Sequence, residues 1–463
     1  ANTLASGGYA VDNSCRFNYG SNDYLTRTPS SASNRKTWTY SFWTKKVSNA
    51  RNPNFLAAGN DGTEILISQN TGDLQFYQYS GGFNAKFTTS QYFRDVSAWY
   101  HIVVAVDTTQ ATASNRVNIY QNGNLITDFP SGEETYPSLN FDFDINNTTA
   151  HYIGRYATGA STTRDGDYYL AEAVLIDGLA LDATSFGEFD EDSGIWKPID
   201  VSGLTFGTNG FYLDFENSGA LGADVSGNTN NFTVNNLTAI DQSTDTCTNN
   251  FATWNSLIKT TATFSEGNLK YAQPGSNPVF GSLSTIGVTS GKWYAELNYT
   301  SGSSHKLVLG VADETFQNGN TTASYDLGKS GTTSSIAYVV NTGDYRVNNS
   351  NTSWGSGGGD GDIINMAIDR DNGKIYFGVN GTWGNSSNPA SNSGGIPTTA
   401  LDSSTNWFWG ITADTSGTSD VGELNFGSPS YSESGGETDG NGYGNFAHAV
   451  PTNYYSLNTK NLA

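Results

Sequence analysis

Positive charge is scarce in this sequence. Its 463 residues include 22 Lys and Arg against 44 Asp and Glu, so the formal net charge is −22 at pH 7. Such a chain repels the phosphate backbone of nucleic acids and the anionic surface of a membrane, so we expect neither as a partner. The acidic residues are scattered along the chain, which is typical of charge that keeps a protein soluble.

Cysteine and long apolar runs are also nearly absent. Cys15 and Cys247 are the two cysteines, which excludes a cysteine-stapled module and a cysteine-based zinc site and leaves open whether these two pair. No apolar run approaches the roughly 20 residues that span a membrane. Residues 1–6 have no basic stretch followed by an apolar core, so we do not expect them to be a signal peptide.

Aromatic residues, glycine and small polar residues are plentiful. This composition suits short strands joined by tight turns better than helices. Residues 38–43 (WTYSFW) alternate apolar with polar, as a half-buried strand does. Two further alternating runs, 116–120 and 374–379, each lead into Asn-Gly, the strongest short hairpin signal. We therefore predict an all-β protein made of two antiparallel jelly-roll or concanavalin-like sandwiches joined by an irregular connector.

Changes in composition predict where the domains end. Residues 201–250 are rich in Asn, Thr, Ser, Gly and Asp and are expected to form an irregular connector. Residues 431–463 begin with a Ser- and Gly-rich stretch and are expected to form a loosely packed tail. The two sandwiches are then residues 1–200 and 251–430.

The first sandwich carries an ordered set of strand motifs: YSFWTKK (40–46), WYHIVVAVD (99–107), VNIYQNG (117–123), YIGR (152–155) and YLAEAVLIDGLALD (169–182). In order and spacing they resemble laminin-G/concanavalin-A-like lectin domains. The resemblance implies two antiparallel sheets packed face to face, and a fold that binds glycans in many of its members.

The second sandwich has a different set: GKWYAEL (291–297), LVLGVA (307–312), GDIINMAIDRDNGKIYF (361–377) and LNFG (424–427). These motifs resemble a SPRY domain. The resemblance implies a bent β-sandwich whose edge loops bind protein partners.

A third resemblance concerns how the modules are arranged. The segments FYLDF (211–215), DVSGNTNNF (224–232), TNNFAT (248–253) and VPTNYYSLNTKNL (450–462) are similar to parts of structural proteins of tailed, especially marine, bacteriophages. This resemblance implies a place on the virion surface, outside the cell. It also implies other virion proteins and further copies of this chain as partners.

Catalytic motifs are weak in the sequence. Some concanavalin-like proteins are glycosidases, which need two carboxyl groups about 5 Å apart in a sugar-binding cleft when they retain configuration. The best candidate pair lies in EFDED (188–192), where alternation would put Glu188, Asp190 and Asp192 on one face. The run ends in Ser-Gly and reads as a surface loop, so we expect no enzymatic activity.

Calcium is the one cofactor that the sequence suggests. Laminin-G-like domains often bind it through loop oxygens, and Asp61, Asp165 and Asp167 are the candidate ligands. Each also lies in an ordinary turn sequence, and no dense Asp-rich loop is present. The alternative that these residues only form turns therefore stays open.

Aromatic residues in polar loops are the other binding signal. Trp354 lies in the polar segment NTSWGS (351–356), and Trp383 follows an Asn-Gly turn. With Tyr345 they are the candidate ligand-binding residues, because such rings stack on sugars or anchor protein interfaces. The alternative for both tryptophans is packing over the end of a sandwich, which we favour for Trp383.

Taken together, these observations predict a non-enzymatic virion protein, such as a fibre, knob or decoration subunit. It would attach to a glycan or protein of the host surface. A secreted bacterial lectin or adhesin is the alternative, and a polysaccharide-degrading enzyme is a more remote one.

Overall fold

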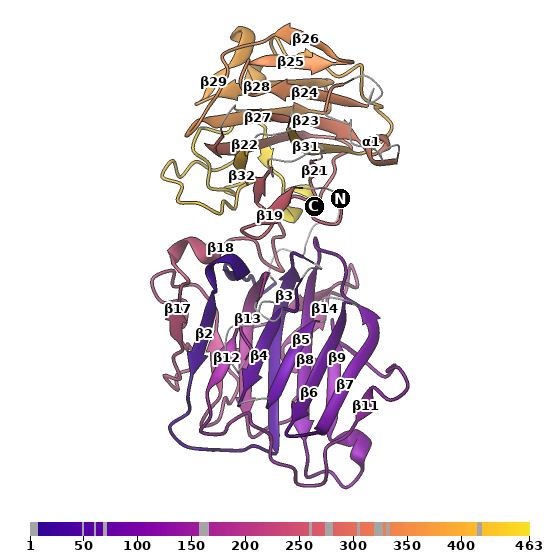
Figure 1. Ribbon diagram of the computed structural model, residues 1–463, viewed down its shortest axis with the longest axis vertical. Helices are drawn as coiled ribbons and strands as arrows, with labels where there is room; N and C mark the ends of the chain where they lie inside the picture. Colours follow the sequence, from indigo (N-terminus) through magenta and orange to yellow (C-terminus); the bar gives the residue numbers. More distant parts are fainter. Residues whose placement is uncertain are drawn as a thin grey trace. The chain divides into compact units, whose positions relative to one another are not determined.

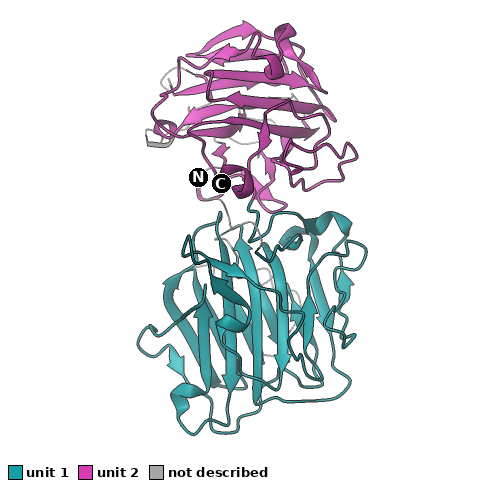
Figure 2. Ribbon diagram, turned by 180° about the vertical axis from the view of Figure 1, so that it is seen from behind, with its two compact units in different colours: residues 1–250, 463 teal, residues 251–462 magenta. Residues whose placement is uncertain are grey.

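The computed structural model describes residues 8–48, 51–59, 62–67, 72–156, 166–258, 262–273, 281–302, 306–318, 327–329, 334–413 and 419–463. The chain divides into two compact units, shown in different colours in Figure 2. Unit 1 contains residues 1–250 and residue 463, and unit 2 contains residues 251–462. Both are built from antiparallel strands (Figure 1), so the predicted all-β fold is confirmed.

Unit 1 has two large sheets over its described residues. The first has the order β10 (Asn124–Leu125), β9 (Val117–Gln121), β8 (Trp99–Asp107), β3 (Thr37–Lys46), β13 (Tyr168–Asp177), β1 (Ser14–Phe17) and β18 (Gln242–Ser243), with β16 (Phe211–Leu213) also paired to β13. The second has the order β11 (Glu134–Thr135), β7 (Phe83–Tyr92), β6 (Asp73–Tyr79), β5 (Thr63–Ile67), β4 (Asn54–Ala58), β12 (His151–Ile153), β2 (Tyr24–Arg27) and β17 (Thr233–Asn235).

Alternation within the strands sorts the side chains between the core and the outer faces. In β3, Trp38, Tyr40 and Phe42 lie in the core between the sheets. Trp43, on the other face of the strand, packs in a second apolar layer outside the first sheet. The hydrophobic pattern that predicted the strands thus also sets which face of each strand is buried.

The Asn-Gly hairpin between β9 and β10 shows why this turn needs its glycine. Asn122 and Gly123 have φ of 46° and 81°, the left-handed backbone that this turn type uses. A Cβ on Gly123 would lie 2.4 Å from the ring of Trp196, so no side chain fits there. The turn sequence is therefore required both for the backbone and for packing.

Residues 201–250 are not a separate connector, and that prediction is wrong. They belong to unit 1, and β16, β17 and β18 add strands to both of its sheets. Arg16 is fully buried beneath this segment, donating to the Ile240 carbonyl at 3.0 Å and lying 3.6 Å from the Asp241 carboxylate. The segment's buried apolar side chains, among them Phe211, Leu213 and Phe232 in the core, are separated by polar turns and make no sustained hydrophobic pattern.

The outer face of the first sheet is covered by a layer that includes the small sheet of β14 (Gly187–Phe189) and β15 (Trp196–Pro198). His101 of β8 lies beneath it and is 1% exposed. Its Nδ1 accepts a hydrogen bond from Trp196 Nε1 at 2.9 Å, and its Nε2 lies 2.8 Å from Ser41 Oγ. Burial lowers the pKa of His101 to about 3, so the ring is neutral and locks the covering layer to the sheet.

This histidine gives unit 1 a measurable sensitivity to acid. Because His101 takes up a proton near pH 6.5 in the unfolded chain and only near pH 3 when folded, its contribution to stability is lost as pH falls below 6.5. We expect the His101→Gln variant to have a lower free energy of unfolding than the wild type at pH 8. At pH 5 this difference in free energy of unfolding should be smaller by about 2 kcal/mol. Urea unfolding at both pH values measures the gap.

Comparing wild type with variant isolates His101 from other buried groups. Burial raises the pKa of Glu172 to about 7, which acts in the opposite direction, and lowers that of His151 to about 4. Both are present in the two proteins and cancel in the comparison. The half-exposed His448 of unit 2 offers a matched control for substitution by Gln. A gap of the same size at both pH values would contradict the prediction.

Unit 2 also has two sheets over its described residues. One has the order β19 (Thr263–Ser265), β20 (Lys270–Ala272), β32 (Val421–Asn425), β22 (Lys292–Ser301), β27 (Ile363–Asp369), β28 (Lys374–Val379) and β29 (Thr382–Trp383), with β30 (Ile396–Pro397) on β28 and β33 (Tyr455–Ser456) on β22. The other has the order β21 (Ser282–Leu283), β31 (Trp407–Ala413), β23 (Leu307–Asp313), β24 (Ser335–Val339), β25 (Asp344–Val347) and β26 (Ser350–Ser353).

Residues 431–463 do not form a loose tail, and that prediction is wrong as well. Phe446 and Tyr454 are buried against Tyr294 and Tyr376, on the outer face of the larger sheet of unit 2. The carboxylate of Glu296, itself fully buried, accepts the backbone N–H groups of residues 447 and 448 at 2.8 and 3.0 Å. The segment looked loose in sequence because most of its contacts are polar and backbone-mediated.

The two cysteines do not pair. Cys15 lies in the core between the sheets, whereas Cys247 packs against the apolar layer outside the first sheet. The helices of the described chain are short, and none has the length and apolar character that crossing a membrane would need.

Candidate functional site: an aromatic pocket on unit 1

Three neighbouring strands of the second sheet present polar and aromatic side chains on their outer face. In β6, Leu74 and Phe76 point into the core, so Gln75, Tyr77 and Tyr79 point outward. The register pairs Tyr77 with Glu64 of β5 on one side and with Lys86 of β7 on the other. A carboxylate, a phenol ring and an ammonium group therefore lie in one row across the sheet.

An open pocket of about 320 Å³ lies over this row. Its volume is within the range of small-molecule sites, at the lower end. Four aromatic and four polar side chains line it: Tyr77, Tyr79, Phe83, Tyr156, Glu64, Gln75, Lys86 and Thr88.

The aromatic rings are arranged around Phe83, at the start of β7. Phe83 is 49% exposed, unusual for a phenylalanine. Its ring meets Tyr77 at 5.8 Å and Tyr79 at 5.3 Å between centroids, both edge to face. These contacts fix the Phe83 ring, so it offers a rigid apolar surface to a ligand.

The charged groups of the pocket are held by hydrogen bonds and ion pairs. Lys86 Nζ lies 2.8 Å from Glu133 Oε1 and 5.1 Å from the centroid of the Phe83 ring. Hydrogen bonds from the Lys86 and Thr88 side chains lower the pKa of Glu133. On the opposite side, Asn54 Nδ2 donates to Glu64 Oε2 at 3.1 Å, and Glu64 is fully buried. The ammonium group is thus neutralised in place, and the pocket combines donors and acceptors without a net positive charge.

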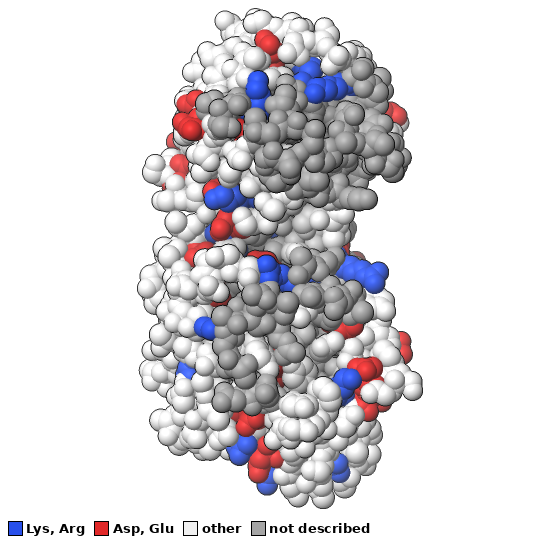
Figure 3. Space-filling model, viewed as in Figure 1, with Lys and Arg blue, Asp and Glu red and all other residues white. Residues whose placement is uncertain are grey.

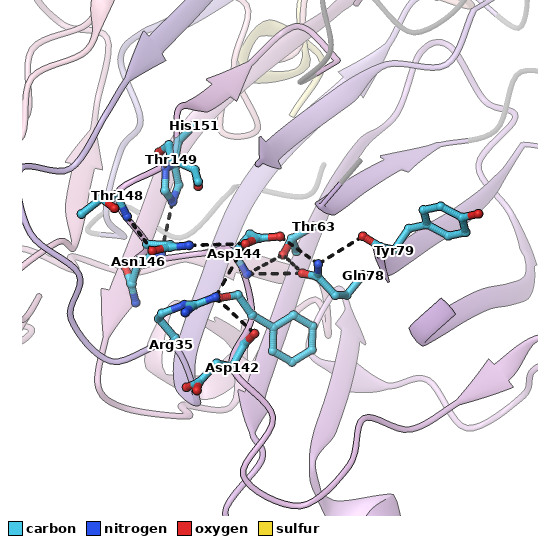
Figure 4. Close-up of polar contacts among 12 residues, drawn as sticks. Arg35, Thr63, Gln78, Tyr79, Asp142, Asp144, Asn146, Thr148, Thr149 and His151 are labelled. Atoms are coloured by element: carbon cyan, nitrogen blue, oxygen red, sulfur yellow. Dashed lines mark hydrogen bonds and ion pairs between the residues drawn. The ribbon is translucent and has the colours of Figure 1, made fainter. Parts of the chain in front are cut away.

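A polar network behind the sheet fixes the strand end that carries Tyr79 (Figure 4). Gln78 points away from the pocket, donating to Asp144 Oδ2 at 2.9 Å and to the Tyr79 carbonyl at 3.4 Å. Arg35 lies 3.6 Å from the same aspartate and donates to the carbonyl of Phe143 at 2.6 Å. These contacts limit the movement of β6, so the tyrosines above it are preorganised.

The aromatic candidates from the sequence are not part of this pocket. Trp354 is 5% exposed, and its Nε1 donates to the Phe377 carbonyl at 2.9 Å inside the core of unit 2. Tyr345 packs edge to face on it at 6.0 Å. Of the two interpretations of Trp354, packing is therefore the one that the structure supports, because a buried indole cannot stack on a sugar.

Trp383 is partly buried on the opposite face of the larger sheet of unit 2. Its ring lies 6.3 Å from Tyr294 and 6.4 Å from Tyr376, both edge to face. This placement agrees with the packing that we favoured for it.

The structure describes one of the three candidate calcium ligands. Asp61 and Asp165 lie outside the residues that the structure describes. Asp167 accepts the backbone N–H of Tyr19 at 2.9 Å and lies 3.9 Å from Arg51, so it is engaged with the protein itself. In the described part of the chain, no three His, Cys, Asp or Glu side chains are grouped so as to hold a metal ion.

The candidate carboxylate pair is bound by a single lysine. Lys197 Nζ lies 3.3 Å from Glu188 and 3.1 Å from Asp190. Hydrogen bonds from Ser193 and Lys197 lower the pKa of Asp190 to about 2, so it is ionised near neutral pH and has no proton to give as a general acid. Together these contacts close the β14–β15 hairpin.

The residues that line the pocket escaped the sequence reasoning. Alternation in residues 73–79 (DLQFYQY) marks a half-buried strand, yet a tyrosine on a strand is as often core as surface. Only the register of three strands shows that Glu64, Tyr77 and Lys86 meet. The one available signal was Phe83 directly after the Ser-Gly-Gly turn, where a strand is beginning and solvent is close.

On the face drawn in Figure 3, the described acidic and basic side chains lie singly or in small groups among uncharged residues. The pocket is therefore distinguished by its aromatic rings rather than by a field of one sign.

A comparison with protein families finds one match. Residues 19–171 match the model of the concanavalin A-like lectin/glucanases superfamily, so this part of unit 1 is a concanavalin A-like domain. The match includes β5, β6 and β7 and hence the strands that line the pocket. No curated protein matches the chain in sequence.

Solved structures also resemble the chain. The SPRY domain of human HERC1 is 14% identical, with a TM-score of 0.30, over 37% of this chain and 96% of that one. The TRIM65 PSpry domain is 14% identical, with a TM-score of 0.27, over 38% of this chain and 91% of that one. A "putative carbohydrate binding protein" from Bacteroides ovatus ATCC 8483 is 16% identical, with a TM-score of 0.36, over 49% of this chain and 59% of that one.

Proposed function

We propose that this protein is a non-enzymatic, carbohydrate-binding adhesion protein, and that the pocket over β5, β6 and β7 holds a glycan. The observation that carries the proposal is the fixed, half-exposed Phe83 ring beside Tyr77 and Tyr79, next to the partly exposed polar groups of Gln75 and Lys86. A sugar ring has apolar C–H faces that stack on aromatic rings and hydroxyl groups that need donors and acceptors at its edge. The pocket offers both kinds of partner within one small volume.

Removal of the aromatic rings tests the site. We expect Phe83→Ala and Tyr77→Ala each to weaken binding of a glycan ligand at least tenfold, about 1.4 kcal/mol, because each removes part of the stacking surface. Titration calorimetry with a ligand found by screening bacterial surface glycans measures the change.

A tyrosine on the same strand serves as control. Tyr92, at the far end of β7, is 54% exposed and does not line the pocket. Tyr92→Ala should bind as the wild type does. If all three variants bound the glycan equally well, the pocket would not be the binding site.

We further propose that the protein is displayed on the exterior of a tailed-phage virion, together with other virion proteins and further copies of itself. The support is the resemblance of residues 211–253 and 450–462 to segments of phage structural proteins. Mass spectrometry of purified virions tests this: the chain should be present at a stoichiometry fixed relative to the capsid protein. Its absence from virions, together with a cleavable signal peptide encoded upstream, would favour a secreted bacterial lectin.

The lack of catalysis is part of the proposal. Glu188 and Asp190 are both paired with Lys197, and a glycosidase needs one of its two carboxyl groups protonated. Release of reducing sugar from the glycan that binds the pocket would contradict this part.

A further inference from the structure

Three side chains with complementary chemistry meet near the C-terminal end of β3, in the first sheet of unit 1. Lys45 lies near the end of β3, and Asp245 and Asn250 lie on the segment that follows β18. Lys45 Nζ donates to Asn250 Oδ1 at 2.9 Å and also forms an ion pair with the Asp245 carboxylate. An amine, an amide and a carboxylate are thus within contact of one another, although 200 residues separate Lys45 from Asp245 along the chain.

The ion pair of this trio is shielded from water, and Asn250 is partly buried beside it. The side chains of Lys45 and Asp245 are 1% and 2% exposed. Trp99 Nε1 donates to Asp245 Oδ1 at 3.1 Å, and Lys45 Nζ lies 5.1 Å from the centroid of the Tyr169 ring. The ion pair therefore lies among aromatic rings and out of bulk water, and the Asp245 carboxylate is in direct contact with the protons of the Lys45 amine.

The amide of Asn250 is held by hydrogen bonds at both its nitrogen and its oxygen. Its Nδ2 donates to the Ser97 carbonyl at 2.6 Å, while its Oδ1 accepts from Lys45. The amide carbon is bonded to that oxygen, so the amine lies beside the electrophilic centre. Two groups held next to each other in this way react far faster than the same groups free in solution.

The geometry points to an intramolecular isopeptide bond between Lys45 and Asn250, with Asp245 as the proton carrier. Asp245 takes a proton from the Lys45 ammonium, and the free amine attacks Cγ of Asn250. The Nζ–Cγ bond forms, the Cγ–Nδ2 bond breaks, and the proton carried by Asp245 passes to the departing nitrogen, which leaves as ammonia. Asp245 then accepts the second proton that Nζ loses on becoming an amide nitrogen, and releases it to solvent. Amine and primary amide become secondary amide and ammonia, so atoms balance and neither an oxidant nor a cofactor is needed.

The bond would join two mechanically important places. β3 is an interior strand of its sheet, paired with β8 and β13. Asn250 is the last residue of unit 1 before the chain enters unit 2. A pulling force that arrives from unit 2 would pass from Asn250 straight to Lys45, so residues 46–249 would carry none of it. Closing such a long loop covalently also restricts the unfolded chain.

Intact-mass spectrometry of the folded wild-type chain tests the inference without any substitution. We expect a mass below that of the sequence by one ammonia, about 17 Da. Peptide mapping should show Lys45 and Asn250 in one branched peptide. The Lys45→Arg, Asn250→Ala and Asp245→Asn variants should have the full mass of their own sequences, and Lys36→Arg, outside the trio, should keep the deficit.

Other results would overturn the inference. A wild-type chain of full mass would do so. An ammonia loss without a branched peptide would indicate a cyclic imide at an asparagine instead, and loss of water with Lys45 joined to Asp245 would make the wrong residue the acyl donor. If folded Asp245→Asn, checked by circular dichroism, still forms the bond, then Asp245 is not the proton carrier.

Discussion

Replacing Trp354 with alanine is expected to lower the free energy of unfolding of unit 2 by about 3–5 kcal/mol. The indole is 5% exposed in the core and contacts the edge of Tyr345. Its Nε1 bonds to the Phe377 carbonyl, so the substitution also leaves that acceptor without its partner. Gly384 packs so tightly on the ring that a Cβ there would lie 2.3 Å from it, which shows how closely the surroundings fit.

Chemical denaturation of the full chain, followed by tryptophan fluorescence and calorimetry, measures this loss. The transition of unit 2 should move, and that of unit 1 should stay. Trp383→Ala is the matched control. Because Trp383 is only partly buried, its substitution should lower the free energy of unfolding clearly less. A Trp354→Ala protein with unchanged stability and weakened ligand binding would reverse our conclusion and return Trp354 to the surface role that the sequence suggested.

Replacing Asp439 with alanine is expected to release the C-terminal segment of unit 2, at a cost of about 3–5 kcal/mol. The Asp439 carboxylate is 5% exposed and is the hub of this segment. Oδ1 accepts the backbone N–H groups of residues 441 and 443 at 2.9 and 3.0 Å. Oδ2 accepts from the backbone N–H and hydroxyl of Ser456 and from the Asn461 amide at 2.9, 2.8 and 2.7 Å. Alanine leaves these donors without their acceptor.

Hydrogen exchange and limited proteolysis of the full chain measure the release. Amides of residues 439–461 should lose protection in Asp439→Ala before the sheets of unit 2 do, since the segment lies on the outside of the larger sheet. Asp439→Asn keeps one acceptor oxygen and should have a smaller effect. The partly exposed Glu433, which accepts the Gly435 N–H at 2.9 Å, is the control for removal of an acidic side chain from the same segment. Unchanged protection in Asp439→Ala would show that the apolar contacts of Phe446 and Tyr454 suffice.

Both predictions concern places where the sequence misled us, and the reason is the same. A tryptophan between serines and glycines, or a segment rich in Asn, Ser and Gly, lacks the hydrophobic pattern that marks buried structure. Trp354 is buried because strands distant in sequence close over it. Residues 431–463 are ordered in part because the buried carboxylates of Asp439 and Glu296 each accept several backbone N–H groups. Residues 201–250 are ordered because their strands pair with both sheets and their scattered apolar side chains are buried in the core.

The candidate site illustrates the same limit. The alternation in β6 and the turn before Phe83 are visible in the sequence, and each is a local property of the chain. Glu64, Tyr77 and Lys86 become one pocket only through the pairing of three strands, and a shift of one residue in that pairing would put them on opposite faces. The meeting of Lys45 with Asn250 depends in the same way on the segment after β18 returning to β3.

The sequence by itself determined the all-β class, the strands and their tight turns, because these follow from alternation and from backbone preferences of neighbouring residues. It also determined the acidic, cysteine-poor character of the chain. Only the tertiary structure decided which aromatic rings face solvent, that both polar segments are built into the units, and which distant side chains meet. Those outcomes depend on register and long-range packing, which no local stretch of sequence encodes.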